Sequence, residues 1–90
     1  MPYRVRLTRR AESALLKLPA DRRKQLLRRM TRLQSNPYPH GKAIKRLEVR
    51  TPAGEPLYRL RSGDYRIVYL VRGAEVIVLA IVHRRDLERA

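Results

Sequence analysis

Three arginines, Arg59, Arg61 and Arg66, stand close together in the chain, where their type and spacing could bind an anion. They lie in two segments of alternating apolar and polar residues, which predict a hairpin that turns at Ser62-Gly63. In that hairpin all three side chains leave the same face of the sheet, together with Asp64. Guanidinium groups donate paired hydrogen bonds to phosphate oxygens, so this face is a candidate phosphate site.

The predicted pairing across this hairpin gives a second reason to expect a bound anion. A two-residue loop pairs Arg61 with Asp64 and places Arg59 directly opposite Arg66. Like charges directly opposite each other destabilise a sheet, and nothing in the sequence relieves the Arg59–Arg66 pair. We interpret the pair as gripping an external anion. The pattern is equally compatible with a plain alternative, in which these arginines form the solvated face of an amphipathic strand.

A histidine ends the last apolar segment and is followed by two arginines, Arg84 and Arg85. Simple alternation along this strand points His83 toward the face of Arg66. It is the candidate general acid or base there, because only its pKa is normally close to neutral. A lone histidine at a strand end is more often structural, and His40, in a proline-rich loop, is interpreted as incidental.

The charge of the chain indicates a polyanionic partner. The 90 residues include 22 lysines and arginines against 8 aspartates and glutamates, a formal net charge of +14. Such an excess makes a compact domain repel itself, which favours a partner such as nucleic acid, the ribosome, an acidic protein or an anionic membrane. The alternative is a basic surface that serves only solubility.

Several classes of site are disfavoured by what the sequence lacks. There is no cysteine, which excludes disulfides, thiolate chemistry and cysteine-based zinc sites, and we expect no metal and no cofactor. The first residues do not resemble a signal peptide, and the longest apolar run, Val76 to Val82, is too short to span a bilayer. We therefore expect a cytoplasmic protein.

The first half of the chain predicts a strand and two helices. Tyr3 to Leu7 alternates as a half-buried strand does, and Thr8 can cap the helix that follows. Pro19 ends that helix, and a second, strongly basic helix is expected over Ala20 to Gln34. The short connection between the two helices predicts that they pack antiparallel. Residues 35–41 have the composition of a loop.

The second half predicts strands. They are expected over 45–49, 57–61, 64–71 and 75–82, the last of them buried on both faces, and the polar tail 83–90 is expected to form one helical turn. Helices followed by a meander of strands indicate an α+β fold. We predict one domain over 1–90, with two antiparallel helices on one face of a twisted, mainly antiparallel sheet of about four strands.

At this point the residues resemble a known family. The segment Leu57 to Tyr69 is similar to the signature hairpin of RelE/ParE toxins, and Ile81 to Leu87 resembles the end of their last strand. Pro19, Asn36-Pro37 and Lys45-Arg46-Leu47 stand where family members have the helix break, the following loop and a strand entry. The resemblance covers nearly the whole chain, and the hairpin is its specific part.

The resemblance implies the toxin of a type II toxin–antitoxin pair, bound and neutralised by an acidic antitoxin. RelE-type members enter the ribosomal A site and cut mRNA by attack of a 2′-hydroxyl on the adjacent phosphate. The family's catalytic arginines correspond to Arg66, Arg59 and Arg84 of this chain, with His83 beside them. Contacts with phosphate or RNA are expected from Arg61, Lys45, Arg46 and Arg85.

Two positions depart from the RelE pattern, and two other functions stay open. Leu57 stands where RelE has a second lysine, and the tail 86–90 lacks the tyrosine of many mRNA-cutting members. One alternative is therefore a ParE-type inhibitor of DNA gyrase. The other is a non-catalytic nucleic-acid-binding module, although no signature of one is present. A membrane-surface helix is disfavoured, because the second helix has no Trp or Phe anchor.

Overall fold

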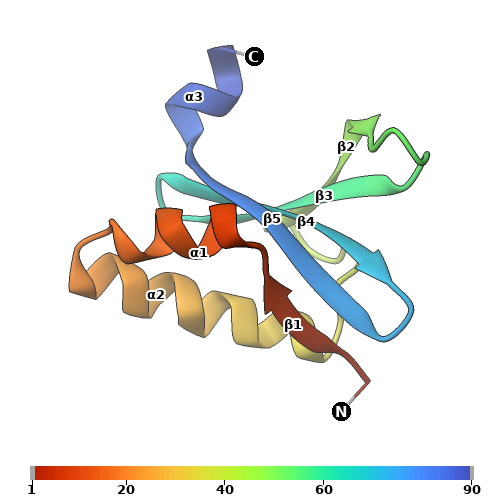
Figure 1. Ribbon diagram of the computed structural model, residues 1–90, viewed down its shortest axis with the longest axis horizontal. Coiled ribbons are helices and arrows are strands. Elements are labelled where there is room, and N and C mark those ends of the chain that lie inside the picture. The colour runs from red at the N-terminus through yellow and green to blue at the C-terminus, as the bar shows by residue number, and fades with distance from the viewer. Residues whose placement is uncertain (1, 90) are drawn as a thin grey trace.

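The computed structural model describes the backbone of residues 2–89 and the side chains of residues 2–86. Two helices pack on one face of a five-stranded sheet, whose strand order is β1-β5-β4-β3-β2 (Figure 1). The strands are β1 (Arg4–Leu7), β2 (Ile44–Arg50), β3 (Pro56–Ser62), β4 (Tyr65–Arg72) and β5 (Glu75–His83), and the helices are α1 (Arg9–Leu16), α2 (Ala20–Thr31), the 3-10 turn η1 (Arg32–Gln34) and α3 (Arg84–Arg89).

The predicted α+β fold is confirmed, with one more strand than expected. The N-terminal strand β1 joins the same sheet and pairs parallel with β5, whereas all other neighbours are antiparallel. A parallel pair needs a long crossover, and the two helices and three strands between β1 and β5 provide it.

The helices begin and end where local chemistry directs them. Thr8 caps α1 as predicted, because its hydroxyl accepts a hydrogen bond from the amide of Ala11 at 3.3 Å. The connection at Pro19 is held by Arg23, whose guanidinium donates to the carbonyls of Leu16 and Leu18, the last of them at 3.1 Å. The second helix tightens into η1 after Thr31, a common way to end a helix.

The core lies between the helices and the sheet. Leu15, Leu26 and Met30 of the helices pack with Ile67 and Val78 of the strands. The prediction that β5 is buried on both faces is correct for its first half only. Val76 and Val78 lie under the helices, and Ile77, on the opposite face, is only 4% exposed. In the second half, Leu79, Ala80 and Val82 are half-buried.

The β3–β4 hairpin differs from the expectation by two residues in register. The loop is Gly63-Asp64 rather than Ser62-Gly63, and Ser62 pairs with Tyr65. Gly63 has a φ of 59°, so the residue without a Cβ takes the first position of the turn. Because the shift is even, every side chain stays on the face predicted for it. The predicted cross-strand pairs Arg61–Asp64 and Arg59–Arg66 are therefore wrong, because Arg61 pairs with Arg66 and Arg59 with Val68.

A β-bulge interrupts the pairing of β4 with β5. Tyr69 pairs with Val78 and Val68 with Ala80, which leaves Leu79 as an extra residue of β5. An extra residue reverses the alternation of side chains beyond it. The residues of β5 after the bulge therefore face the opposite way from what simple alternation predicts.

One buried hydrogen bond fixes the loop after η1 on the sheet. The hydroxyl of Tyr69 donates to the carbonyl of Pro37 at 2.6 Å, and both residues are fully buried. Burial raises the pKa of Tyr69, which keeps this hydroxyl a donor.

We expect Tyr69→Phe to lower the free energy of unfolding by about 1–3 kcal/mol, because the carbonyl of Pro37 would stay buried without its donor. Denaturant unfolding followed by circular dichroism measures the change. Tyr58→Phe is the matched control, since the Tyr58 ring stacks on Tyr69 but no hydrogen bond of its hydroxyl occurs within the described residues. Equal losses for the two variants would show that the Tyr69–Pro37 bond contributes nothing special.

Candidate functional site

The three arginines of the hairpin gather on the sheet face that the helices leave open. Arg61 lies directly opposite Arg66, and Arg59, opposite Val68, is the diagonal neighbour of Arg66. Arg59 and Arg66 are half-buried and Arg61 is exposed. The predicted face is thus correct, although the arginine across from Arg66 is Arg61 and not Arg59.

Backbone carbonyls hold two of the three guanidinium groups. Arg66 donates through Nη1 to the carbonyls of Gly63 and Tyr65, at 3.0 Å each. Arg59 donates through Nη1 to the carbonyl of Ala43 at 3.2 Å. Each group therefore has a defined position and keeps further N–H donors for a ligand, because a guanidinium carries five.

No carboxylate among the described side chains, residues 2–86, forms an ion pair with this cluster. Within the described part of the chain, the ion pairs join Arg6 to Glu75, Arg72 to Glu55, and Arg84 to Asp64, and none of them involves the three arginines of the hairpin.

The pKa of Arg59 reflects the same excess of positive charge. Burial lowers the pKa of Arg59, and the positive charges of Arg66 and Arg61 lower it further. Arginine remains protonated at neutral pH despite such a shift, so the repulsion persists. An anion placed among the three groups would relieve it.

The strand β2 contributes one of its two expected basic residues to this face. Lys45 pairs with Arg59 and so lies on the same side of the sheet, whereas Arg46 pairs with Tyr58 and leaves the opposite side. Both are exposed. The structure thus brings Lys45 to the cluster and separates Arg46 from it.

The turn that holds Arg66 also holds the start of α3. The amide of Arg84 donates to the carbonyl of Asp64 at 2.7 Å, and its Nε lies 3.6 Å from the Asp64 carboxylate. Arg84 therefore lies at the same end of the sheet as Arg66, whose guanidinium contacts Gly63 of that turn. The ion pair is exposed and weak, so it leaves Arg84 available to a ligand. Arg85, which follows, is exposed.

The expectation that His83 faces Arg66 is wrong. His83 pairs with Tyr65, and their rings meet edge to face with centroids 5.4 Å apart, on the side of the sheet that carries the core. The bulge at Leu79 is the cause, because it reverses the alternation on which the expectation was based. The Nδ1 of His83 accepts from the amide of Arg85 at 3.2 Å, an interaction that fits a structural role.

One residue near the cluster was missed at the sequence level. Arg29 of α2 donates through Nη2 to the carbonyl of Arg61 at 2.8 Å, and its Nε is buried without a partner in the described residues. The hydroxyl of Ser62, next in the chain, is likewise buried and unpartnered. The only sequence signal was that Arg29 lies beside the apolar stripe of Leu26 and Met30.

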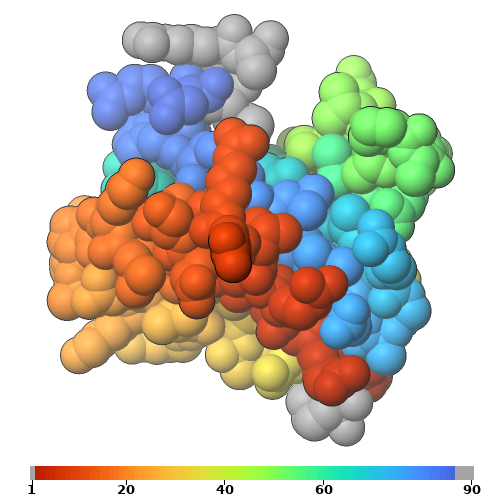
Figure 2. All heavy atoms as spheres, viewed as in Figure 1, coloured from red at the N-terminus to blue at the C-terminus, as the bar shows by residue number. Residues whose placement is uncertain are grey.

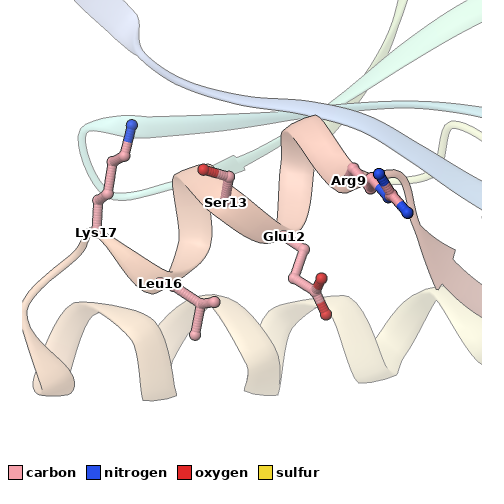
Figure 3. Close-up of a pocket in the computed structure, with 5 residues that line it drawn as sticks. All are labelled: Arg9, Glu12, Ser13, Leu16 and Lys17. Atoms are coloured by element: carbon pink, nitrogen blue, oxygen red, sulfur yellow. The ribbon is translucent and has the colours of Figure 1, made fainter.

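A separate hollow of about 510 Å³ lies on α1, lined by Arg9, Glu12, Ser13, Leu16 and Lys17 (Figure 3). Glu12 and Leu16 leave the helix on one side, and Ser13 and Lys17 leave it on the other. Leu16 is 64% exposed, so the hollow is open surface. It contains none of the arginines of the hairpin, and we locate the candidate site on the sheet.

Two absences hold for the part of the chain that the structure describes. No three histidine, aspartate or glutamate side chains come together in a way that could hold a metal ion. No helix there is long and apolar enough to cross a membrane.

The chain is similar to known toxins over nearly its whole length. Residues 5–88 match the family described as the ParE toxin of the type II toxin–antitoxin system parDE. No curated protein matches the sequence. An archaeal RelE–RelB complex from Pyrococcus horikoshii contains a chain that is 31% identical, with a TM-score of 0.77, and the match covers 93% of this chain and 97% of that one.

Two further solved structures of toxin–antitoxin complexes contain chains similar to this one. The RelBE2 toxin–antitoxin complex of Mycobacterium tuberculosis gives 28% identity and a TM-score of 0.74, over 93% of this chain and 100% of the other. The RelB–RelE complex of Methanococcus jannaschii, at 22% identity and a TM-score of 0.70, supports the fold over 93% and 95% of the two chains. The family match and the structural matches agree with the hairpin and the helix pair, and the chain belongs to the RelE/ParE superfamily of toxins of type II toxin–antitoxin systems.

Proposed function

We propose that this toxin inhibits translation by cutting mRNA on the ribosome, as an endoribonuclease of the RelE type. The observation that carries the proposal is the cluster of Arg59, Arg61 and Arg66, which lies on an open sheet face and has no carboxylate partner among the side chains that the structure describes. Three guanidinium groups, two of them held by backbone carbonyls, suit a phosphate that gains negative charge in the transition state. The matches to RelE chains support the same activity.

The proposed reaction needs no metal. The 2′-hydroxyl of one nucleotide attacks the adjacent phosphorus, a bond forms between phosphorus and the 2′-oxygen, and the bond to the 5′-oxygen of the next nucleotide breaks. The 2′-hydroxyl loses a proton and the 5′-oxygen gains one. The requirement for a 2′-hydroxyl restricts cleavage to RNA.

In this proposal, the role of each basic residue follows from its position on the sheet. Arg66 and Arg61, facing each other, and Arg59 beside them stabilise the charge on the phosphate. Lys45 and Arg84, at the margins, hold neighbouring phosphates, and Arg85 adds diffuse attraction. Arg46 lies on the other face and so contacts RNA only outside this site.

Proton transfer falls to the ribosome in this proposal. Arginine does not give up its proton readily, and His83 faces the core side of the sheet. No other histidine is present except His40, whose Nδ1 lies 2.7 Å from the carbonyl of Tyr38 in the loop before β2. A toxin that provides only electrostatic stabilisation needs its acid and base from the ribosome, which would make cleavage ribosome-dependent.

We further propose a cytoplasmic acidic antitoxin as the partner. The solved relatives are complexes of RelE with RelB, and the net charge of +14 favours an acidic protein. The toxin expressed alone should then arrest growth, and it should be tolerated together with its antitoxin.

The second candidate function is inhibition of DNA gyrase. Two observations favour it: the matching family is described as the ParE toxin, and the candidate general base His83 points away from the arginines. On this alternative the basic face would bind gyrase or DNA without chemistry.

We expect Arg66→Ala to slow mRNA cleavage by on the order of a hundredfold or more, because it removes a donor aimed at developing charge. His83→Ala and Arg28→Ala should cleave at nearly the wild-type rate, since His83 faces the core side and Arg28 is one exposed helix arginine among several. Cleavage by purified toxin on programmed ribosomes, mapped by primer extension, measures these rates. A wild-type toxin that leaves mRNA intact but blocks supercoiling by gyrase would establish the alternative function.

Arg29 provides a second test, because it positions Arg61 without reaching the open face. The carbonyl of Arg61 lies near the end of β3, beyond the first residue of β2, so no residue of β2 can donate to it. The guanidinium of Arg29 donates to this carbonyl instead. Removing it should let the cluster shift, and small misplacements of catalytic groups cost roughly ten- to a hundredfold in rate.

We therefore expect Arg29→Ala to lower kcat with little change in KM, and Arg29→Lys to restore part of the activity. Arg28→Ala is the matched control in the same helix. Equal effects of the Arg28 and Arg29 variants would contradict a positioning role for Arg29.

A further inference from the structure

The strand β1 is an edge of the sheet with an unused row of backbone groups. Arg4 and Thr8 donate their amides to the carbonyls of Ala74 and Val78 on the β5 side, at 2.8 and 3.0 Å. Because successive residues of a strand point their backbone groups to opposite sides, the amides and carbonyls of Val5 and Leu7 point to the free edge. β1 is the end of the strand order, so no strand of the described chain pairs with them.

A groove runs beside this edge. It has a volume of about 160 Å³ and lies between β1 and α2, lined by Val5, Leu7, Leu27, Met30, Thr31 and Gln34. Figure 1 shows the ribbon of β1 beside the C-terminal half of α2, and Figure 2 shows the same side of the molecule with all heavy atoms. Leu27 is 46% exposed. A cavity of roughly 150 Å³ accommodates a group the size of benzene, so the groove can take one large apolar side chain.

The strand and the helix that border this groove are basic. Apart from Arg29, which contacts β3, they contain six basic residues, two in Arg4–Leu7 and four in Ala20–Thr31, and a single acidic one, Asp21. A negatively charged partner would therefore be attracted to this part of the surface.

The other edge of the sheet is a poorer template. Strand β2 carries a register irregularity between Arg46 and Arg50, whereas all four residues of β1 keep one register with β5. Bulges and charges are the usual means by which an edge strand is protected from pairing. Of the two sheet edges in residues 2–89, β1 is the one with a regular register, and an apolar groove lies beside it.

We propose that an extended, acidic segment of the antitoxin pairs with the free edge of β1 and inserts an apolar side chain into the groove beside Leu27. Backbone hydrogen bonds to Val5 and Leu7 would provide affinity, and the groove and the surrounding arginines would provide specificity. This inference rests on the proposed antitoxin partner and adds where that partner binds.

Amide hydrogen exchange of the full toxin, alone and with the purified antitoxin, tests the pairing directly. The amides of Val5 and Leu7 should exchange quickly in the free toxin and slow by at least about tenfold in the complex, because only then do they have acceptors. A complex that forms while both amides stay unprotected would overturn the proposed edge pairing and leave the toxin–antitoxin function intact. An acidic antitoxin that neither binds nor relieves growth arrest would overturn the proposed partner, and the groove with it.

Two variants test the same surface through affinity. Val5→Pro removes an amide that points outward, a place where edge strands tolerate proline. Leu27→Glu places a carboxylate in the apolar groove. Each should weaken antitoxin binding, measured by calorimetry, by at least about tenfold.

Leu16→Glu is the matched control, because Leu16 is exposed on α1 and does not line the groove. All three variants should still arrest growth when expressed alone, which shows that they fold. Undiminished affinity of both groove variants in folded toxin would overturn the proposal.

Discussion

Much of the structure depends on the β-bulge at Tyr69 of β4. At this point two residues of β5, Val78 and Leu79, lie opposite one residue of β4. Before this bulge, Val76 and Val78 lie under the helices; after it, the odd-numbered Ile81 takes their place in the core. Thr8 fixes the same point from the other side. Its amide donates to Val78, its hydroxyl donates to Leu79 at 3.2 Å, and the same hydroxyl caps α1. The bulge thus sets where β1 ends, where α1 begins and which β5 residues face the arginines.

The second constraint is the charge that the open face retains. Arg59, Arg61 and Arg66 repel one another, and the fold opposes this repulsion with backbone carbonyls rather than carboxylates. A carbonyl fixes the position of a guanidinium without cancelling its charge. Arg59 and Arg66 are therefore held in place while the cluster stays positive, which an anion site requires. A carboxylate at the same place would stabilise the free protein and compete with the anion.

Much of this arrangement could be predicted from the sequence. Alternation placed β1 and both faces of the hairpin correctly, the apolar run of 75–82 placed β5, and capping and proline rules placed the helices. The register was wrong by two, because Ser62-Gly63 and Gly63-Asp64 both satisfy turn rules, and an even shift leaves the faces unchanged. The orientation of His83 could not be predicted, since the bulge lies in a continuous apolar run where alternation has no visible phase. The contact of Arg29 joins residues 32 apart, which no local pattern reports.

Helix α2 connects the arginine cluster with the groove beside β1. Leu27, Met30 and Thr31 line the groove, and Arg29 donates to Arg61 near the cluster. Successive helical residues differ by about 100° in direction, so Leu27 and Arg29 leave α2 on nearly opposite sides. A segment seated in the groove would therefore not cover the arginines by itself. On the function proposed above, an antitoxin anchored there would neutralise the toxin in one of two ways: a second part reaches the sheet face, or its bulk keeps the toxin out of the ribosome. Because the groove and the cluster are separate, the two proposals make binding and neutralisation separable.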